Sequence, residues 1–128
     1  MILDSSALVA IVLAEPGHQR VLDKIKASPR NVIGAPTLVE SLIVLSARLG
    51  GDPVPALKDL LRALGTEVIS FTEDHSYVAL KAYLKFGRGR HPAALNFGDC
   101  ISYAVAALAR EPLLYVGNDF LRTDVLSA

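Results

Sequence analysis

Short apolar runs alternate with longer amphipathic segments along nearly the whole chain. Four runs are predicted to be strands, at residues 1–3, 31–35, 68–71 and 113–116, and a short last strand is expected at 125–126. Between them, apolar residues recur every three or four positions, which predicts helices at residues 7–13, 16–27, 37–49, 53–65, 72–86 and 97–110. This order is typical of a parallel sheet covered by helices. The predicted fold is a three-layer α/β/α domain with a central, mainly parallel sheet of four to five strands.

Polar and special residues mark the ends of these segments. The hydroxyls of Ser5 and Ser6 can cap the first helix, and Asn96 can cap the last. Pro36 stops the second strand, and Gly50 closes the helix after it. The chain shows no internal repeat or linker, so residues 1–128 are expected to form a single domain.

Composition narrows the choice of function. The chain is 52% hydrophobic, which excludes disorder, and its 13 basic and 13 acidic residues give no net charge. If the chain binds a nucleic acid, it must do so through a local patch of charge. The apolar content predicts that a partner covers some surface. The one cysteine, Cys100, is expected to pack in the core. Asp4 lies where a secretory signal would be basic, and no apolar run is long enough to span a membrane, so the chain is expected to be cytoplasmic and without membrane contact.

Four acids fall beside the predicted strands. Asp4 and Asp119 follow the first and fourth strands, whereas Glu40 and Asp99 lie in the first turns of the helices that follow the second strand and precede the fourth. Ligands of parallel sheets bind where the carboxyl ends of strands meet the helix N-termini. The four carboxylates are therefore expected to converge at one edge.

Each acid also has an ordinary structural explanation. Asp4 can end a strand and cap a helix, and Asp119 can be a turn residue. Thr37 and Glu40 match a capping box, and Asp99 can complement a helix dipole. The convergence favours a site, because clustered carboxylates repel one another unless a cation lies among them. Oxygen ligands without a thiolate cluster or paired histidines favour Mg²⁺ or Mn²⁺, the ions of metal-dependent phosphodiester cleavage.

A basic stretch lies between His75 and Gly98, where the chain has no acid. It contains the residues Lys81, Lys85, Arg88, Arg90 and His91. Glycines at 87 and 89 predict an exposed loop beside the helix that carries Asp99. The loop is either a solvated connection or a grip for phosphates next to the acidic edge.

Four segments together resemble those of PIN-domain proteins, and more narrowly VapC-type toxins of toxin–antitoxin pairs. They are Met1-Ile-Leu-Asp4-Ser5-Ser6-Ala7-Leu8, Ala35-Pro36-Thr37-Leu38-Val39-Glu40, Gly87-Arg88-Gly89-Arg90-His91-Pro92-Ala93-Ala94-Leu95-Asn96-Phe97-Gly98-Asp99-Cys100, and Gly117-Asn118-Asp119-Phe120 with Thr123-Asp124. They occur in the family's order over almost the whole chain. The third segment is the most specific of them.

The resemblance implies an endoribonuclease that depends on Mg²⁺ or Mn²⁺, inhibits translation and is usually a homodimer. It implies that Asp4, Glu40, Asp99 and Asp119 are the catalytic acids and metal ligands, supported by Ser6 and Asp124. Lys85, Arg88, Arg90 and His91 are the expected RNA contacts. The resemblance also implies a cognate antitoxin that covers the active site.

Two other functions compete with this one. The first is a PIN-like module that binds RNA or protein without catalysis, although all four acids are present. The second is a receiver-like signalling domain, which also binds Mg²⁺ in an acidic pocket. That domain needs adjacent acids after the first strand and a lysine near the last strand. Here serines follow Asp4 and no lysine follows Lys85, so the sequence disfavours the receiver-like domain.

Overall fold

A computed structural model describes all 128 residues, which form four strands and six helices. In chain order these are β1 (Ile2–Leu3), α1 (Ser5–Val12), α2 (His18–Ala27), β2 (Asn31–Gly34), α3 (Ala35–Leu49), α4 (Val54–Ala63), β3 (Thr66–Ile69), α5 (Glu73–Phe86), α6 (Phe97–Ala109) and β4 (Leu113–Leu114). The sheet order is β3-β2-β1-β4, and every pair is parallel. The expected parallel α/β sheet is confirmed.

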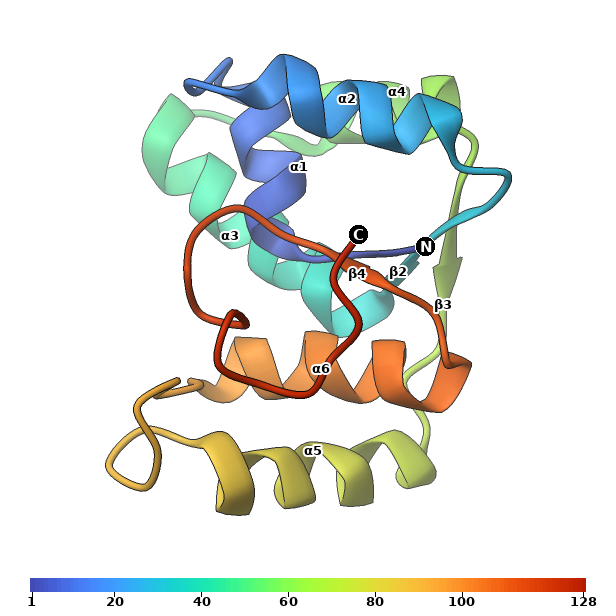
Figure 1. The fold of residues 1–128 in the computed structure, drawn as a ribbon. Coiled ribbons are helices and arrows are strands. Elements are labelled where there is room, and N and C mark those ends of the chain that lie inside the picture. Colours follow the sequence, from blue (N-terminus) through green and yellow to red (C-terminus); the bar gives the residue numbers. More distant parts are fainter.

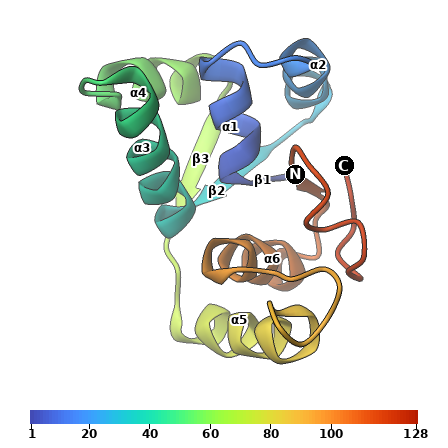
Figure 2. The ribbon, with the colours of Figure 1, turned by 90° about the vertical axis from the view of Figure 1, so that its left-hand side faces the viewer.

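The sheet has helices on both faces. Figures 1 and 2 show α5 and α6 below the sheet and α1 to α4 above it. Successive side chains of a strand point to opposite faces. Accordingly, Ile2 and Leu113 belong to one core cluster with α5 and α6, whereas Leu3 and Leu114 belong to a second cluster with the other four helices. The two cores explain why the central strands are continuously apolar. No helix combines the length and apolar character that crossing a bilayer requires.

Three strand predictions need correction. The fourth strand ends at Leu114 rather than at residue 116. The third strand occupies Thr66–Ile69, two residues before its predicted position, because its pairing with β2 runs from Asn31↔Thr66 to Gly34↔Ile69. This edge strand is only partly buried, so its apolar residues do not mark its limits. The short last strand is reduced to one parallel bridge between Leu113 and Ser127.

Helix starts also differ from the prediction. Helix α2 begins at His18 rather than at residue 16. Helix α1 begins at Ser5, and its cap is Asp4 rather than a serine. Helix α3 begins at Ala35, because Pro36 fits the first turn of a helix, where no amide hydrogen bond is lost. Thr37 therefore lies inside the helix, where its hydroxyl is 3.3 Å from that of Ser102. The capping box predicted for Thr37 and Glu40 is wrong, so Glu40 has no capping role.

Candidate active site

Parallel strands bring the four acids toward one end of the sheet. Asp4 follows β1 and Asp119 lies beyond β4, the strand that pairs with β1 in parallel. Helix α3 starts directly after β2 and carries Glu40, and Asp99 lies in the first turn of α6. The charges of Asp119, Asp4 and Glu40 all act on Asp99. Helix starts and strand ends thus place four carboxylates within electrostatic reach of one another.

Asp4 is the most buried of these acids, with 5% of its surface exposed. Its Oδ2 accepts hydrogen bonds from the Ser6 amide at 3.0 Å and the Ser6 hydroxyl at 2.5 Å. The Ser6 hydroxyl in turn accepts one from the Val116 amide at 3.0 Å, just beyond β4. Because both donors use Oδ2, Oδ1 is left available to a cation. Ser6 thus orients Asp4 and ties the ends of two neighbouring strands together.

Glu40 extends from α3 to the start of α6. A Cβ at position 98 would collide with both carboxylate oxygens of Glu40, so Gly98 leaves the space that this carboxylate occupies. Burial raises the pKa of Glu40, and the charge of Asp4 raises it further, while a hydrogen bond with the Ser5 side chain opposes the shift. Glu40 therefore lies against the helix start that bears Asp99.

Asp99 combines a structural role with a place among the acids. Its Oδ2 accepts a hydrogen bond from the Asn96 amide at 2.8 Å, and its own amide donates to Asn96 Oδ1 at 2.9 Å, which forms a capping box. Burial raises the pKa of Asp99 to about 6. The Asn96 amide opposes this rise, whereas the charges of Asp119, Asp4 and Glu40 add to it. Ionisation of Asp99 is therefore less favourable than that of an ordinary aspartate, and a nearby cation would favour it.

Asp119 lies in an exposed loop after β4. Gly117 adopts φ 109°, a left-handed conformation that favours glycine, and this lets the chain turn before Asp119. In this structure no three acidic, histidine or cysteine side chains are placed to hold one metal ion together. The donor set nevertheless fits a hard cation, because it consists of carboxylates alone.

Burial raises the pKa of the Cys100 thiol to about 11, which agrees with a packing role.

The predicted basic residues divide into two groups. Arg88 and Arg90 are exposed in the loop after α5, where the Arg90 guanidinium lies 5.5 Å from the Tyr83 ring centroid. His91 is half-buried, and its Nδ1 accepts a hydrogen bond from the Ala93 amide. Lys85, in contrast, donates to Asp124 Oδ2 at 2.7 Å.

Asp124 makes different contacts from those expected of a support for the metal ligands. Its two carboxylate oxygens accept hydrogen bonds from Lys85 and Tyr103. It is also not among the charges that shift the pKa of Asp99 or Glu40. Asp124 thus anchors a loop to two helices. It makes no direct hydrogen bond to the four acids that it was expected to support.

Three features of this region were not predicted from the sequence. They are the space left by Gly98, the Val116 amide that holds Ser6, and the exposure of Phe97, which is 82%. A glycine inside the first turn of a helix was a usable signal for the first, because glycine costs helix stability without another purpose. The other two depend on contacts between distant segments and had no local signal.

Known proteins share the sequence family and the fold of this chain. The family model described as PIN domain matches residues 1–126. Ribonuclease VapC36 of Mycobacterium tuberculosis is 46% identical over 126 residues, which cover 98% of this chain and 91% of that protein. The crystal structure of M. tuberculosis VapC20, a toxin that cleaves the sarcin-ricin loop, has a TM-score of 0.80 at 17% identity and covers 99% of this chain and 97% of that one. A toxin–antitoxin complex from Klebsiella pneumoniae has a TM-score of 0.72 at 17% identity, covering 99% and 95%.

The chain belongs to the PIN-domain family, and within that family to the VapC ribonucleases. The identification made from the sequence motifs is confirmed, and so is the class of activity, a toxin endoribonuclease. Membership of this family rules out the receiver-like alternative, which the sequence already disfavoured. The non-catalytic alternative loses its main support, because these relatives are named as ribonucleases.

The raised pKa of Asp99 predicts that removing its charge stabilises the metal-free protein. Stability from this group is greatest below the ordinary pKa of an aspartate and is lost as the pH rises to about 6. Asp99→Asn keeps an oxygen to accept from the Asn96 amide. In EDTA at pH 8, we expect this variant to raise the Tm by roughly 3 °C or more.

The gain should shrink as the pH is lowered toward 4.5, where Asp99 is protonated. Asp23→Asn, on an exposed position of α2, serves as the matched control and should leave the Tm unchanged. Differential scanning calorimetry across this pH range measures both. A lower Tm for Asp99→Asn at pH 8 would show that the capping role outweighs the repulsion.

Proposed function

We propose that Asp4, Glu40, Asp99 and Asp119 bind Mg²⁺ or Mn²⁺ and use it to hydrolyse phosphodiester bonds in RNA. The observation that carries the proposal is the electrostatic coupling of four carboxylates at one edge of the sheet. A bound divalent ion would supply the charge that favours ionisation of a water molecule and offsets the negative charge developing on the phosphate. Its charge would also offset the burial and the repulsion that raise the pKa of Asp99.

The four acids divide into two kinds of ligand. Asp4 and Asp99 are held in place through one oxygen each, by Ser6 and by the Asn96 amide, and this leaves their second oxygens for the ion. Glu40 and Asp119 complete the site by turning toward them. Asp119 is exposed and Glu40 has a longer side chain, so both can make this movement. Either can also orient the attacking water.

RNA approaches the acids along the basic loop. Arg88 and Arg90 are exposed and paired with no acid, so both can contact phosphates that the acidic edge repels. His91 lies in the same loop and can add a further contact. Lys85 contributes less than expected from the sequence, because its ammonium is paired with Asp124.

A cognate antitoxin is the proposed inhibitor. The Klebsiella relative is described as a toxin–antitoxin complex, which supports such a partner. The same repulsion that favours a metal ion favours any cation, so a lysine or arginine of the antitoxin placed among the acids would relieve it. Inhibition would then combine blocked access with displaced metal.

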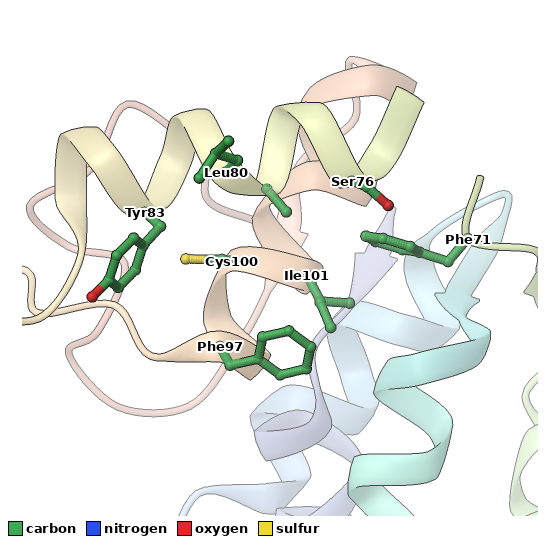
Figure 3. A pocket seen from close by; sticks show the side chains of 8 residues that line it. Phe71, Ser76, Leu80, Tyr83, Phe97, Cys100 and Ile101 are labelled. Carbon is green, nitrogen blue, oxygen red and sulfur yellow. The ribbon is translucent and has the colours of Figure 1, made fainter. Parts of the chain in front are cut away.

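A homodimer is proposed through the face formed by α3, α5 and the start of α6. This face exposes large apolar side chains, namely Val39, Ile43, Leu80, Leu84 and Phe97. Figure 3 shows the hollow between α5 and α6, of about 450 Å³, with Phe97 at its border. A second hollow, of about 610 Å³, lies on the other side of Phe97 against α3. A protruding ring beside apolar hollows can fit a second copy of itself, as a twofold dimer requires.

Cleavage is expected to require both metal and Asp99. The purified chain should cut total RNA with Mg²⁺ or Mn²⁺ and stop in excess EDTA. Asp99→Asn should reduce the rate by roughly 100-fold or more, because a ligand is lost. Asp23→Asn, purified in the same way, controls for contaminating nuclease. Equal cleavage by wild type and Asp99→Asn contradicts the proposal, and RNA binding without cleavage in any metal favours the non-catalytic module.

The arginine loop is expected to bind RNA without binding metal. In an Asp99→Asn background, which prevents cleavage, Arg88→Ala with Arg90→Ala should weaken RNA binding by roughly tenfold and reduce the salt dependence by about two charges. Fluorescence anisotropy measures this. Arg20→Ala with Lys26→Ala removes two exposed charges from α2 and should change little. A large loss of Mn²⁺ affinity in the arginine variant would contradict the separation of roles.

The dimer face predicts a change in oligomeric state. Phe97→Asp should convert a dimer into a monomer in light scattering, because a charge would be buried in an apolar contact. Leu108→Asp places the same charge on an exposed apolar position near the other end of α6 and should leave the dimer intact. A wild-type monomer at micromolar concentration, or a dimeric Phe97→Asp, would rule out this face.

A further inference from the structure

The loop from Gly117 to Asp124 carries Asp119 but is held by other residues. Asp119 is exposed, and the loop's own hydrogen bonds come from Leu121, Thr123 and Val125. Phe120 is only 2% exposed, and its ring lies 4.9 Å from that of Tyr115, so it fixes the loop just after Asp119. At its far end, Asp124 makes the side-chain contacts of the loop, and the residues just beyond it, Leu126 and Ala128, exchange backbone hydrogen bonds with Leu113.

Asp124 joins this loop to two helices. The Tyr103 hydroxyl, on α6, donates to Asp124 Oδ1 at 2.6 Å, and Lys85 Nζ, in the last turn of α5, donates to Oδ2 at 2.7 Å. Tyr103 lies one helical turn after Asp99. In Figures 1 and 2 the segment after β4 accordingly runs beside α6. The helix that carries Asp99 thus also carries the anchor of the loop that carries Asp119.

We propose that Tyr103, through its hydrogen bond to Asp124, is a positioning residue that fixes the loop bearing Asp119 relative to Asp99. Asp124 is then a tether rather than a metal ligand. This inference rests on the proposed function, because the value of a fixed Asp119 lies in its contribution to the metal site.

The donors of the two contacts to Asp124 differ in burial, because Tyr103 is half-buried on α6 whereas Lys85 is exposed. The Lys85 and Asp124 side chains are 62% and 52% exposed, and an ion pair in water contributes little. The Tyr103 hydroxyl donates to an ionised carboxylate, and such hydrogen bonds are about twice as strong as neutral ones. Burial, together with Asp124, raises the pKa of Tyr103, while Lys85 and Tyr103 lower the pKa of Asp124. Tyr103 therefore stays a donor and Asp124 an acceptor, and Tyr103→Phe is the informative change.

The proposal predicts that Tyr103 acts on metal binding through Asp119. By calorimetric titration with Mn²⁺, Tyr103→Phe should weaken binding by roughly tenfold, as the loss of a supporting hydrogen bond commonly does. In an Asp119→Ala background the same substitution should have no further effect. Tyr115→Phe is the matched control, because it removes a tyrosine hydroxyl that contacts Ser127 and keeps the ring beside Phe120.

A measurement without metal tests the tether by itself. The amides of Leu121 and Thr123 donate to carbonyls inside the loop, so their hydrogen exchange reports its opening. Tyr103→Phe should speed their exchange by roughly tenfold in EDTA while the amides in the middle of α6 stay unchanged. Tyr115→Phe should leave these loop amides at the wild-type rate.

The outcomes separate the competing explanations. An equal loss of Mn²⁺ affinity in both backgrounds, or loop amides that exchange at the wild-type rate, would overturn the positioning role. If Asp124→Asn weakens Mn²⁺ binding in the Asp119→Ala background, then Asp124 is a ligand and the tether is wrong. If the wild-type chain binds no Mn²⁺, the proposed metal site fails, whereas the exchange measurement still decides whether Tyr103 holds the loop.

Discussion

Asp4, Glu40, Asp99 and Asp119 repel one another, and the folded chain has to hold them together against that repulsion. It does so with contacts that belong to the fold itself. Ser6 holds Asp4, the cap of α6 holds Asp99, and the backbone at Gly98 leaves the space in which Glu40 lies. Burial and repulsion both disfavour the ionised carboxylates, so a cation bound among them would be stabilising. A metal ion and a basic side chain of an inhibitor would satisfy the same preference.

Charge on this chain is balanced in number but separated in space. The acids gather at the carboxyl ends of the strands, and the free arginines gather in the loop between α5 and α6. Such a separation would suit a polyanionic substrate, since the proposed roles give phosphate binding to one region and the chemistry to the other. Net charge alone gave no indication of this, because opposite local fields cancel in the sum.

Periodicity predicted the fold well because both faces of the sheet are buried, which makes the central strands plainly apolar. It failed at β3, an edge strand whose limits are set by pairing with β2 rather than by burial. Strand order predicts that the four acids lie toward one edge, and their role as metal ligands stays a prediction. Only the alternative explanation of Glu40 fails, because the helix starts earlier, at Ala35, and this removes the capping box. The contacts of Asp124 with Lys85 and Tyr103 had no local signal, because they join segments that are distant in the sequence.

The pairing of β1 with β4 has a consequence for biosynthesis. Ile2 lies opposite Leu113, so the first strand gains its neighbour only after more than a hundred further residues have been made. Contacts this distant in sequence form late, because the intervening chain must be ordered first. Asp4 follows the first strand and Asp119 follows the last one. A ribosome making this ribonuclease would therefore carry a nascent chain that lacks one of the four proposed metal ligands until synthesis has passed residue 119.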